Sequence, residues 1–132
     1  MEISDAANVR ILGANFNLVS GNGLEISNGT SVQLTDVALD AADTGVLIED
    51  GSSVTIERLS VRDALTAGVS VTSSASATID GSAIQGNLKS VDRKSGATVS
   101  LGNTRLDGPV AGGLTCVGVY DANYQPLNSS CQ

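Results

Sequence analysis

Apolar residues recur along this 132-residue chain in one fixed register. Counted from Val54, apolar side chains stand 8 and 6 positions before it and 2, 5 and 7 positions after it. Over the five repeats anchored at Val9, Val32, Val54, Ala77 and Val99, small or large apolar residues occupy 27 of the 30 positions, although such residues make up only 41% of the chain. Successive anchors are 23, 22, 23 and 22 residues apart. The chain is therefore a tandem repeat.

The repeat predicts a solenoid of short strands. A unit of this length cannot bury its apolar face alone and needs neighbours stacked on it. Within each unit the apolar residues alternate with period two, which is typical of strands. In the second unit we expect strands at 24–27, 32–34 and 37–39. Inward Val, Ile and Leu side chains would form one continuous core, with each strand paired in parallel to its equivalent about 4.8 Å away.

Two columns of turn residues support the same register. The first strand of each unit is followed by residues suited to turns, and only two residues separate the second strand from the third. Most of these residues tolerate positive φ at low cost, so we interpret both columns as structural. They are Asp5-Ala6, Asn28-Gly29, Asp50-Gly51, Ser73-Ser74 and Ser95-Gly96 after the first strand, and Gly13, Asp36, Arg58, Gly81 and Asn103 before the third.

Three short strands per unit, a tight second turn rich in Gly and Asn, and a variable third turn resemble the right-handed parallel β-helix of the pectate-lyase-like superfamily. That superfamily includes pectate lyases, polygalacturonases and NosD-type repeat proteins. The resemblance covers Met1 to about Thr115. It implies an all-β, right-handed, single-stranded parallel β-helix of about five full coils of 22–23 residues plus a C-terminal cap. No catalytic motif of those enzymes matches residue by residue, so the resemblance predicts a fold rather than a reaction.

Composition narrows the possible functions. The net charge is −7 with only seven Lys and Arg residues, which argues against nucleic acid as a partner. No apolar run approaches the 18–20 residues of a membrane span. The chain has no histidine, which removes Ser-His-Asp and Cys-His catalysis and the usual zinc sites. We expect no cofactor and no metal.

The two cysteines lie near the C-terminus. We expect residues 1–116 to form the coils and residues 117–132 to form a cap, which covers the last apolar face and strand edges. A Cys116–Cys131 disulfide would tie the cap back and contribute roughly 3 kcal/mol; the alternative is two buried free thiols. A disulfide implies secretion or the periplasm. The N-terminus does not resemble a secretion signal. Either the protein begins directly with a coil, or a signal and an N-terminal cap have been removed, which is the alternative we favour.

Candidate catalytic residues lie on the face of the first strands, where the resemblance implies that a substrate would bind. The carboxylates Glu25, Glu49 and Asp92 are the candidates, because paired carboxylates about 5 Å or 6.5–9.5 Å apart cleave glycosidic bonds. Acids on an exposed strand are more often simply solvated. The outward residues expected here are Glu25, Leu47, Ser70 and Asp92 in one column and Ser27, Glu49, Thr72 and Lys94 in the next.

Arg93 occupies a nominally inward position. A guanidinium group in an apolar core costs several kcal/mol unless it is paired. We therefore predict a bulge that turns Arg93 outward, where it and Lys94 would be candidate ligand-binding residues for an anion.

Other binding chemistries have weaker support. Four acids, Asp36, Asp40, Asp43 and Asp50, offer oxygen ligands that Ca²⁺ would accept, but they should project from different edges. Tyr120 and Tyr124 lie in the expected cap, where they would cover the end of the helix. The outward column Arg10, Gln33, Thr55, Thr78 and Ser100 has too few threonines for an ice-binding row.

We expect the chain to be a non-catalytic structural or recognition module of a secreted or surface protein, or the C-terminal part of a larger one. The alternative is a minimal or truncated polysaccharide lyase or glycoside hydrolase that uses carboxylates on the first-strand face. The expected partners are carbohydrate or a second copy, which would bind the N-terminal coil through Met1, Ile3, Val9, Ile11 and Phe16.

Overall fold

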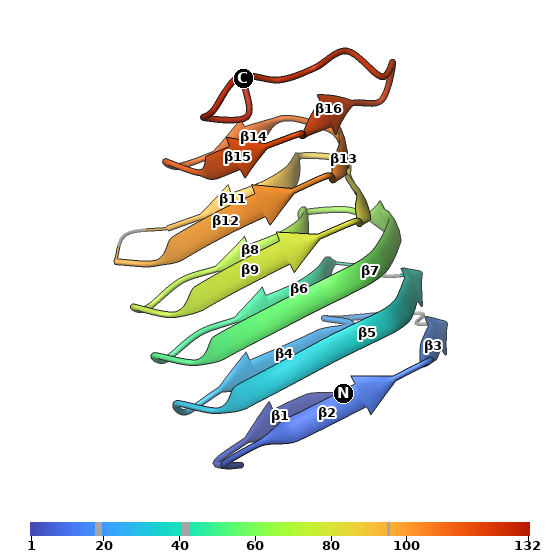
Figure 1. The fold of residues 1–132 in the computed structure, drawn as a ribbon. Helices are drawn as coiled ribbons and strands as arrows, with labels where there is room; N and C mark the ends of the chain where they lie inside the picture. Colours follow the sequence, from blue (N-terminus) through green and yellow to red (C-terminus); the bar gives the residue numbers. More distant parts are fainter. Residues whose placement is uncertain (18–19, 41–42, 95) are drawn as a thin grey trace.

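The computed structural model describes residues 1–17, 20–40, 43–94 and 96–132. Within these residues every regular element is a β-strand. The chain winds into a right-handed coil of about five turns, with the first coil at one end and the C-terminal segment across the other (Figure 1). The predicted parallel β-helix is confirmed.

Each coil contributes to three faces. The first-strand face is one six-stranded parallel sheet, and the other strands form a second, larger sheet that bends between a second-strand face and a third-strand face. The first-strand face contains β1 (Glu2–Ser4), β4 (Leu24–Ser27), β6 (Thr44–Ile48), β8 (Ala67–Val71), β11 (Lys89–Arg93) and β14 (Val110–Ala111). The second-strand face contains β2 (Val9–Leu12), β9 (Ser76–Asp80), β12 (Thr98–Gly102), β15 (Thr115–Val117) and the first halves of β5 (Ser31–Asp40) and β7 (Ser53–Ala64). The third-strand face contains β3 (Asn15–Asn17), β10 (Ala83–Gly86), β13 (Arg105–Asp107), β16 (Tyr120–Asp121) and the second halves of β5 and β7.

The anchor residues of the repeat stack one above the next. Val32 pairs with Val54, Val54 with Ala77, and Ala77 with Val99, in unbroken parallel register. All four are at most 3% exposed and belong to one continuous hydrophobic core. The apolar residues at these inward positions of the repeat thus form the core of the molecule.

The second and third strands merge in two coils, although the sequence predicted two separate strands. β5 and β7 run through the second turn, where Asp36 and Arg58 each have a φ of 55°. A single left-handed residue bends the strand onto the next face while the parallel pairing on both sides continues. The positive φ predicted for this turn column is confirmed at all five positions. In the first-turn column, Ser95 lies outside the described residues.

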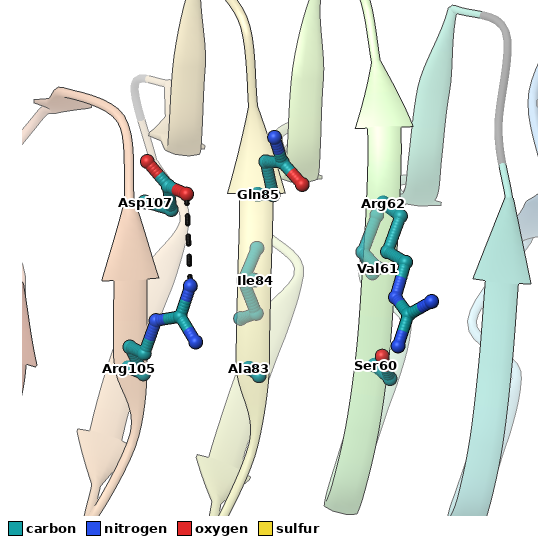
Figure 2. Close-up of a pocket in the computed structure, with 8 residues that line it drawn as sticks. All are labelled: Ser60, Val61, Arg62, Ala83, Ile84, Gln85, Arg105 and Asp107. Carbon is teal, nitrogen blue, oxygen red and sulfur yellow. Dashed lines mark ion pairs between the residues drawn. The ribbon is translucent and has the colours of Figure 1, made fainter. Parts of the chain in front are cut away.

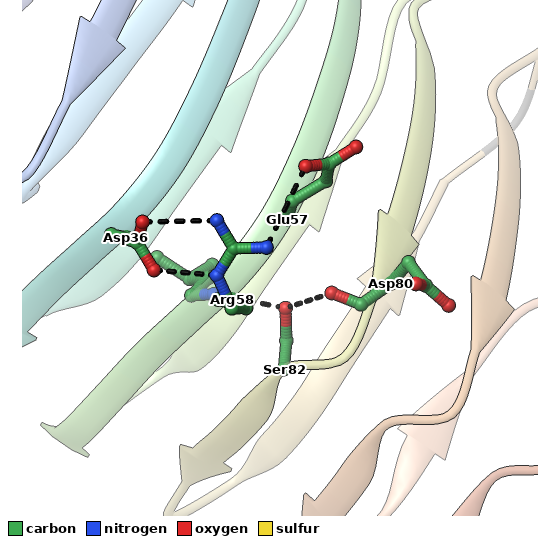
Figure 3. A network of polar contacts seen from close by, with 6 residues as sticks. Asp36, Glu57, Arg58, Asp80 and Ser82 are labelled. Atoms are coloured by element: carbon green, nitrogen blue, oxygen red, sulfur yellow. Dashed lines mark hydrogen bonds and ion pairs between the residues drawn. The ribbon is translucent and has the colours of Figure 1, made fainter.

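Two of the three polar residues at inward positions, Ser82 and Thr104, lie beside the second turn and are almost completely buried. The Leu59 amide donates to Ser82 Oγ at 3.0 Å, and the Ser82 amide donates to Thr104 Oγ1 at 3.3 Å. Ser82 Oγ in turn donates to the Asp80 carbonyl, and Figure 3 shows this contact beside the Arg58 ion pairs. The two hydroxyls therefore satisfy backbone groups at the second turn, which is why a buried polar residue is tolerated there.

The last coil is much shorter than the others. Ser100 pairs with Thr115, only 15 residues later, and Leu101 lies opposite Cys116. Cys116 and Cys131 form the predicted disulfide, with Cα atoms 5.7 Å apart, and both are at most 5% exposed. The C-terminal segment is tied to this coil because the Cys116 amide donates to the Ser129 carbonyl at 2.9 Å.

Candidate functional site

The predicted carboxylates lie along the first-strand face, where Asp92 is far from Glu25. Glu25, Leu47, Ser70 and Asp92 occupy one column in parallel register, as the repeat predicted. Glu25 and Asp92 are therefore three coils apart, about 14 Å at the usual strand spacing. That separation exceeds the range for a catalytic carboxylate pair.

Asp92 is held by two lysines. Its side chain is only 9% exposed, with Lys89 Nζ at 3.1 Å and Lys94 Nζ at 3.9 Å from its carboxylate oxygens. The two ammonium groups thus lie beside the Asp92 carboxylate. This arrangement suits a structural ion pair.

Glu49 has the clearest electrostatic perturbation among the candidates. Partial burial, then the negative charges of Asp50 and Glu25, raise the pKa of its carboxyl group above the ordinary value. Glu25 accepts a hydrogen bond from Asn22 Nδ2 at 3.3 Å. Glu25 and Glu49 thus influence one another, whereas Asp92 stands apart.

Besides Asp92, two residues predicted to point outward from this face are buried. Ser27 is 7% exposed, at the end of β4, where its carbonyl accepts a hydrogen bond from Thr30 Oγ1 across the first turn. Ser70 is 5% exposed, in the middle of the sheet between Leu47 and Asp92. The part of this face that a ligand can reach is therefore narrower than the alternation of residues suggested.

The bulge predicted at Arg93 is wrong. Arg93 pairs in regular parallel register with Val71, and it is half-buried. Its Nε donates to the Ala97 carbonyl at 2.6 Å, so the guanidinium group is satisfied by backbone beyond the first turn. A methyl group on Gly112 would collide with Arg93, so the short last coil passes directly over it. The Arg93 side chain therefore contacts backbone, whereas Lys94 lies beside Asp92.

A polar hollow lies on the third-strand face, where the sequence singled out no residue. It has a volume of about 120 Å³. Ser60, Ala83 and Arg105 form one outward column and Gln85 and Asp107 part of the next, so the register of β7, β10 and β13 builds the hollow. In Figure 2 the Arg62 side chain extends over the strand toward Ser60, and Arg105 points toward Asp107. The hollow is lined by Ser60, Val61, Arg62, Ala83, Ile84, Gln85, Arg105 and Asp107.

Arg105 links this hollow to an aromatic pair. Its Nη2 lies 3.7 Å from Asp107 Oδ2, and its guanidinium carbon lies 5.8 Å from the centre of the Tyr124 ring. Tyr124 stacks on Tyr120, with ring centres 5.5 Å apart, and is 69% exposed. The tyrosines predicted to cover the end of the helix thus also border the third-strand face.

The comparison with known families agrees with this architecture. Residues 1–124 match the family described as the right handed beta helix region. The chain belongs to the right-handed β-helix family. No curated protein and no solved structure gave a significant match. Family membership accounts for the coil and leaves the ligand open, because this fold carries many functions.

The acids considered for Ca²⁺ do not gather within this β-helix. Asp36 instead forms a bidentate ion pair with Arg58, at 2.6 and 2.9 Å, and that guanidinium lowers the pKa of the Asp36 carboxyl group (Figure 3). Among the described residues no group of three or more potential ligands could hold a metal ion. Those residues also include no helix long and apolar enough to cross a membrane.

Proposed function

We propose that this chain is a non-catalytic recognition module of a secreted or surface protein, with carbohydrate as its ligand. The observation that carries the proposal is the in-register stacking of outward side chains over a continuous rigid core. A long ligand can lie across several coils and meet similar side chains at each step, with little loss of protein entropy on binding. Asp92, one of the three candidate catalytic acids, is instead engaged in ion pairs with the ammonium groups of Lys89 and Lys94.

The disulfide supports the proposed location. Cys116 and Cys131 close a loop in the chain, and such bonds persist in oxidising compartments. This bond is consistent with an extracellular or periplasmic protein. A recognition module there would meet polysaccharides of cell surfaces or of the surrounding matrix.

A glycan array, read with and without Ca²⁺, tests this function. We expect the protein to retain a defined subset of oligosaccharides, with no dependence on Ca²⁺. The retained glycans are then incubated with the protein and assayed for new reducing ends and for unsaturated products. Binding without products supports the proposal. The proposal would be contradicted if the protein bound no glycan on the array, or if it cleaved a glycan that it binds.

Cleavage of a glycosidic bond is a second candidate, favoured by one observation. The raised pKa of Glu49 beside Glu25 is the environment of a general acid. In that reaction Glu49 would protonate the leaving oxygen, and Glu25 would act as base or nucleophile. Turnover that Glu49→Gln abolishes, while binding persists, would establish this candidate.

Glu49→Gln also has a predicted effect on stability. Because the folded state raises the pKa of this carboxyl group, Glu49 favours folding below its ordinary value of 4.5 and loses that contribution as the pH rises through the folded-state pKa. The variant should therefore be slightly more stable than the native protein at pH 7, by less than about 1 kcal/mol. The gain should disappear near pH 3.

Urea denaturation at both pH values measures this difference. Glu2→Gln is the matched control, because Glu2 lies in the same column as Glu25 but is exposed on β1. The control should show little change in its pH dependence relative to the native protein. A gain for Glu49→Gln that is equal at pH 3 and pH 7 would contradict the electrostatic explanation.

A further inference from the structure

We propose that the hollow on the third-strand face binds one ring of an uncharged oligosaccharide. This inference rests on the proposed recognition function and specifies where the ligand lies and what its chemistry is. It concerns β7, β10 and β13, on a different face from the candidate carboxylates.

The hollow arises because short side chains lie between longer ones on the same face. Ser60 and Ala83 are small residues at equivalent positions of adjacent coils, and they form the floor. Arg62 and Arg105 are long side chains on either side of this floor (Figure 2). The result is a depression of about 120 Å³ bordered by hydrogen-bond donors, a suitable size for one sugar ring lying against the sheet.

The polar groups around the floor match the chemistry of a sugar ring. Hydroxyl groups both donate and accept hydrogen bonds, so a ring bearing several of them needs donors and acceptors side by side. The guanidinium groups supply donors, Asp107 supplies acceptors, and the Gln85 amide and Ser60 hydroxyl supply both. The Arg105 Nη2 to Asp107 Oδ2 distance of 3.7 Å leaves both groups free to engage adjacent ring hydroxyls.

Charge favours a neutral ring over an acidic one. The two arginines at the hollow are matched by Asp107, which lines it, and by Asp40, which is paired in register with Arg62. The hollow therefore carries little net charge, while the whole chain carries −7. A polyanion would gain little locally and would be repelled by the rest of the molecule.

Several polar groups of the hollow still lack partners. The Arg105 Nε is enclosed and has no hydrogen-bond acceptor among the described residues. In the same part of the chain, Arg62 has no carboxylate within 4.0 Å, and no side-chain hydrogen bond is formed by the Gln85 amide. Such groups gain partners when a ligand provides them, which is a common feature of binding sites.

An aromatic ring continues the surface toward the C-terminal end. Tyr124 contacts Arg105 and is 69% exposed, and Tyr120 pairs in register with Arg105. Tyrosine offers an apolar face together with a polar hydroxyl, which suits the mixed surface of a sugar. We assign the next ring of the oligosaccharide to Tyr124, so that the ligand runs across the coils.

Calorimetric titration of the intact protein tests the site. The probes are the neutral hexasaccharides of glucose, mannose and xylose in β-1,4 linkage, and hexagalacturonate as the acidic counterpart. Arg62→Ala removes a donor, and Ala83→Tyr fills the exposed floor without touching the core. Arg10→Ala is the matched control for loss of a guanidinium group, since Arg10 is exposed on the second-strand face, and Ser53→Tyr is the matched control for bulk on the same face.

We expect at least one neutral hexasaccharide to bind more tightly than hexagalacturonate. Arg62→Ala should weaken this binding at least fivefold and Ala83→Tyr should abolish it, whereas both controls should bind as the native protein does. Binding that survives Ala83→Tyr would overturn the placement in the hollow and leave the recognition function intact. Tighter binding of hexagalacturonate would overturn the neutral ligand class. Binding of none of the four probes would overturn this inference, and the glycan array then decides the recognition function separately.

Discussion

Replacement of Cys131 by serine is expected to lower the free energy of unfolding by about 3 kcal/mol, the chain-entropy estimate for a loop of 15 residues. The effect is large because Cys131 is 3% exposed against the last coil, so serine also buries a hydroxyl group there. Urea denaturation of the native and variant proteins measures the difference. The native protein in reducing agent should lose a similar amount of stability.

The control uses the same reducing agent on the variant. Cys131→Ser has no disulfide to reduce, so its urea transition should not move when the reducing agent is added. An equal loss of stability in both proteins would show that the reducing agent acts elsewhere. A native transition that is unchanged by reduction would contradict the role of the disulfide.

The physical basis of this prediction is the exposed end of the coil. Leu114 and Val119 are buried beneath the C-terminal segment, which is tied down by the Leu127 amide donating to the Val119 carbonyl at 2.8 Å. Without the disulfide this segment would detach more readily and expose those side chains together with open strand edges. Light scattering should therefore detect more association for the variant than for the oxidised native protein.

Sequence reasoning succeeded where one physical rule dominates. Inward positions such as Val32, Val54 and Val99 were predictable, because successive side chains of a strand point to opposite faces of the sheet. The face that is buried carries apolar side chains, so apolar residues at every second position mark it. The second-turn column was predictable for a similar reason, since Gly, Asn and Asp tolerate positive φ. Both rules act on single positions, so one sequence is enough to reveal them.

Sequence reasoning failed where several residues act together. Ser60 and Ala83 look like ordinary outward residues, and the hollow exists only because longer neighbours flank them after stacking. Arg93 looked incompatible with its inward position, because the sequence did not show that the Ala97 carbonyl lies within reach of its Nε. Side-chain length and the path of the next turn decide these cases, and neither follows from an alternation of apolar residues.

A column of small residues at the start of the first strands was also missed. Gly23, Gly45, Gly68 and Ser90 each lie nine positions before an anchor. A methyl group on Gly45 would collide with the Gly68 carbonyl, and one on Gly68 would lie 2.7 Å from the Ser90 carbonyl. At the three glycines, successive coils therefore approach each other too closely for a side chain. The repeat selects glycine at this position for space, since Gly68 is not in the left-handed region.

Gly68→Ala is accordingly expected to destabilise the protein by roughly 1–3 kcal/mol, the range for overpacking of a dense interior. The new methyl group would collide with the Ile84 side chain as well as with the Ser90 carbonyl, so neither the core nor the backbone of the next coil can yield freely. The free energy of unfolding in urea measures the loss, and strand signals in circular dichroism show whether the coil persists.

Gly113→Ala is the matched control for this substitution. Gly113 is exposed, its φ also lies outside the left-handed region, and the nearest atom to an added methyl group is Arg93 Nη1 at 4.0 Å. This variant should stay within about 0.5 kcal/mol of the native protein. Equal losses at the two positions would mean that glycine is required for backbone freedom. A large loss at Gly68 alone would instead show that the close stacking of the coils, which fixes every outward column, depends on the absence of a side chain there.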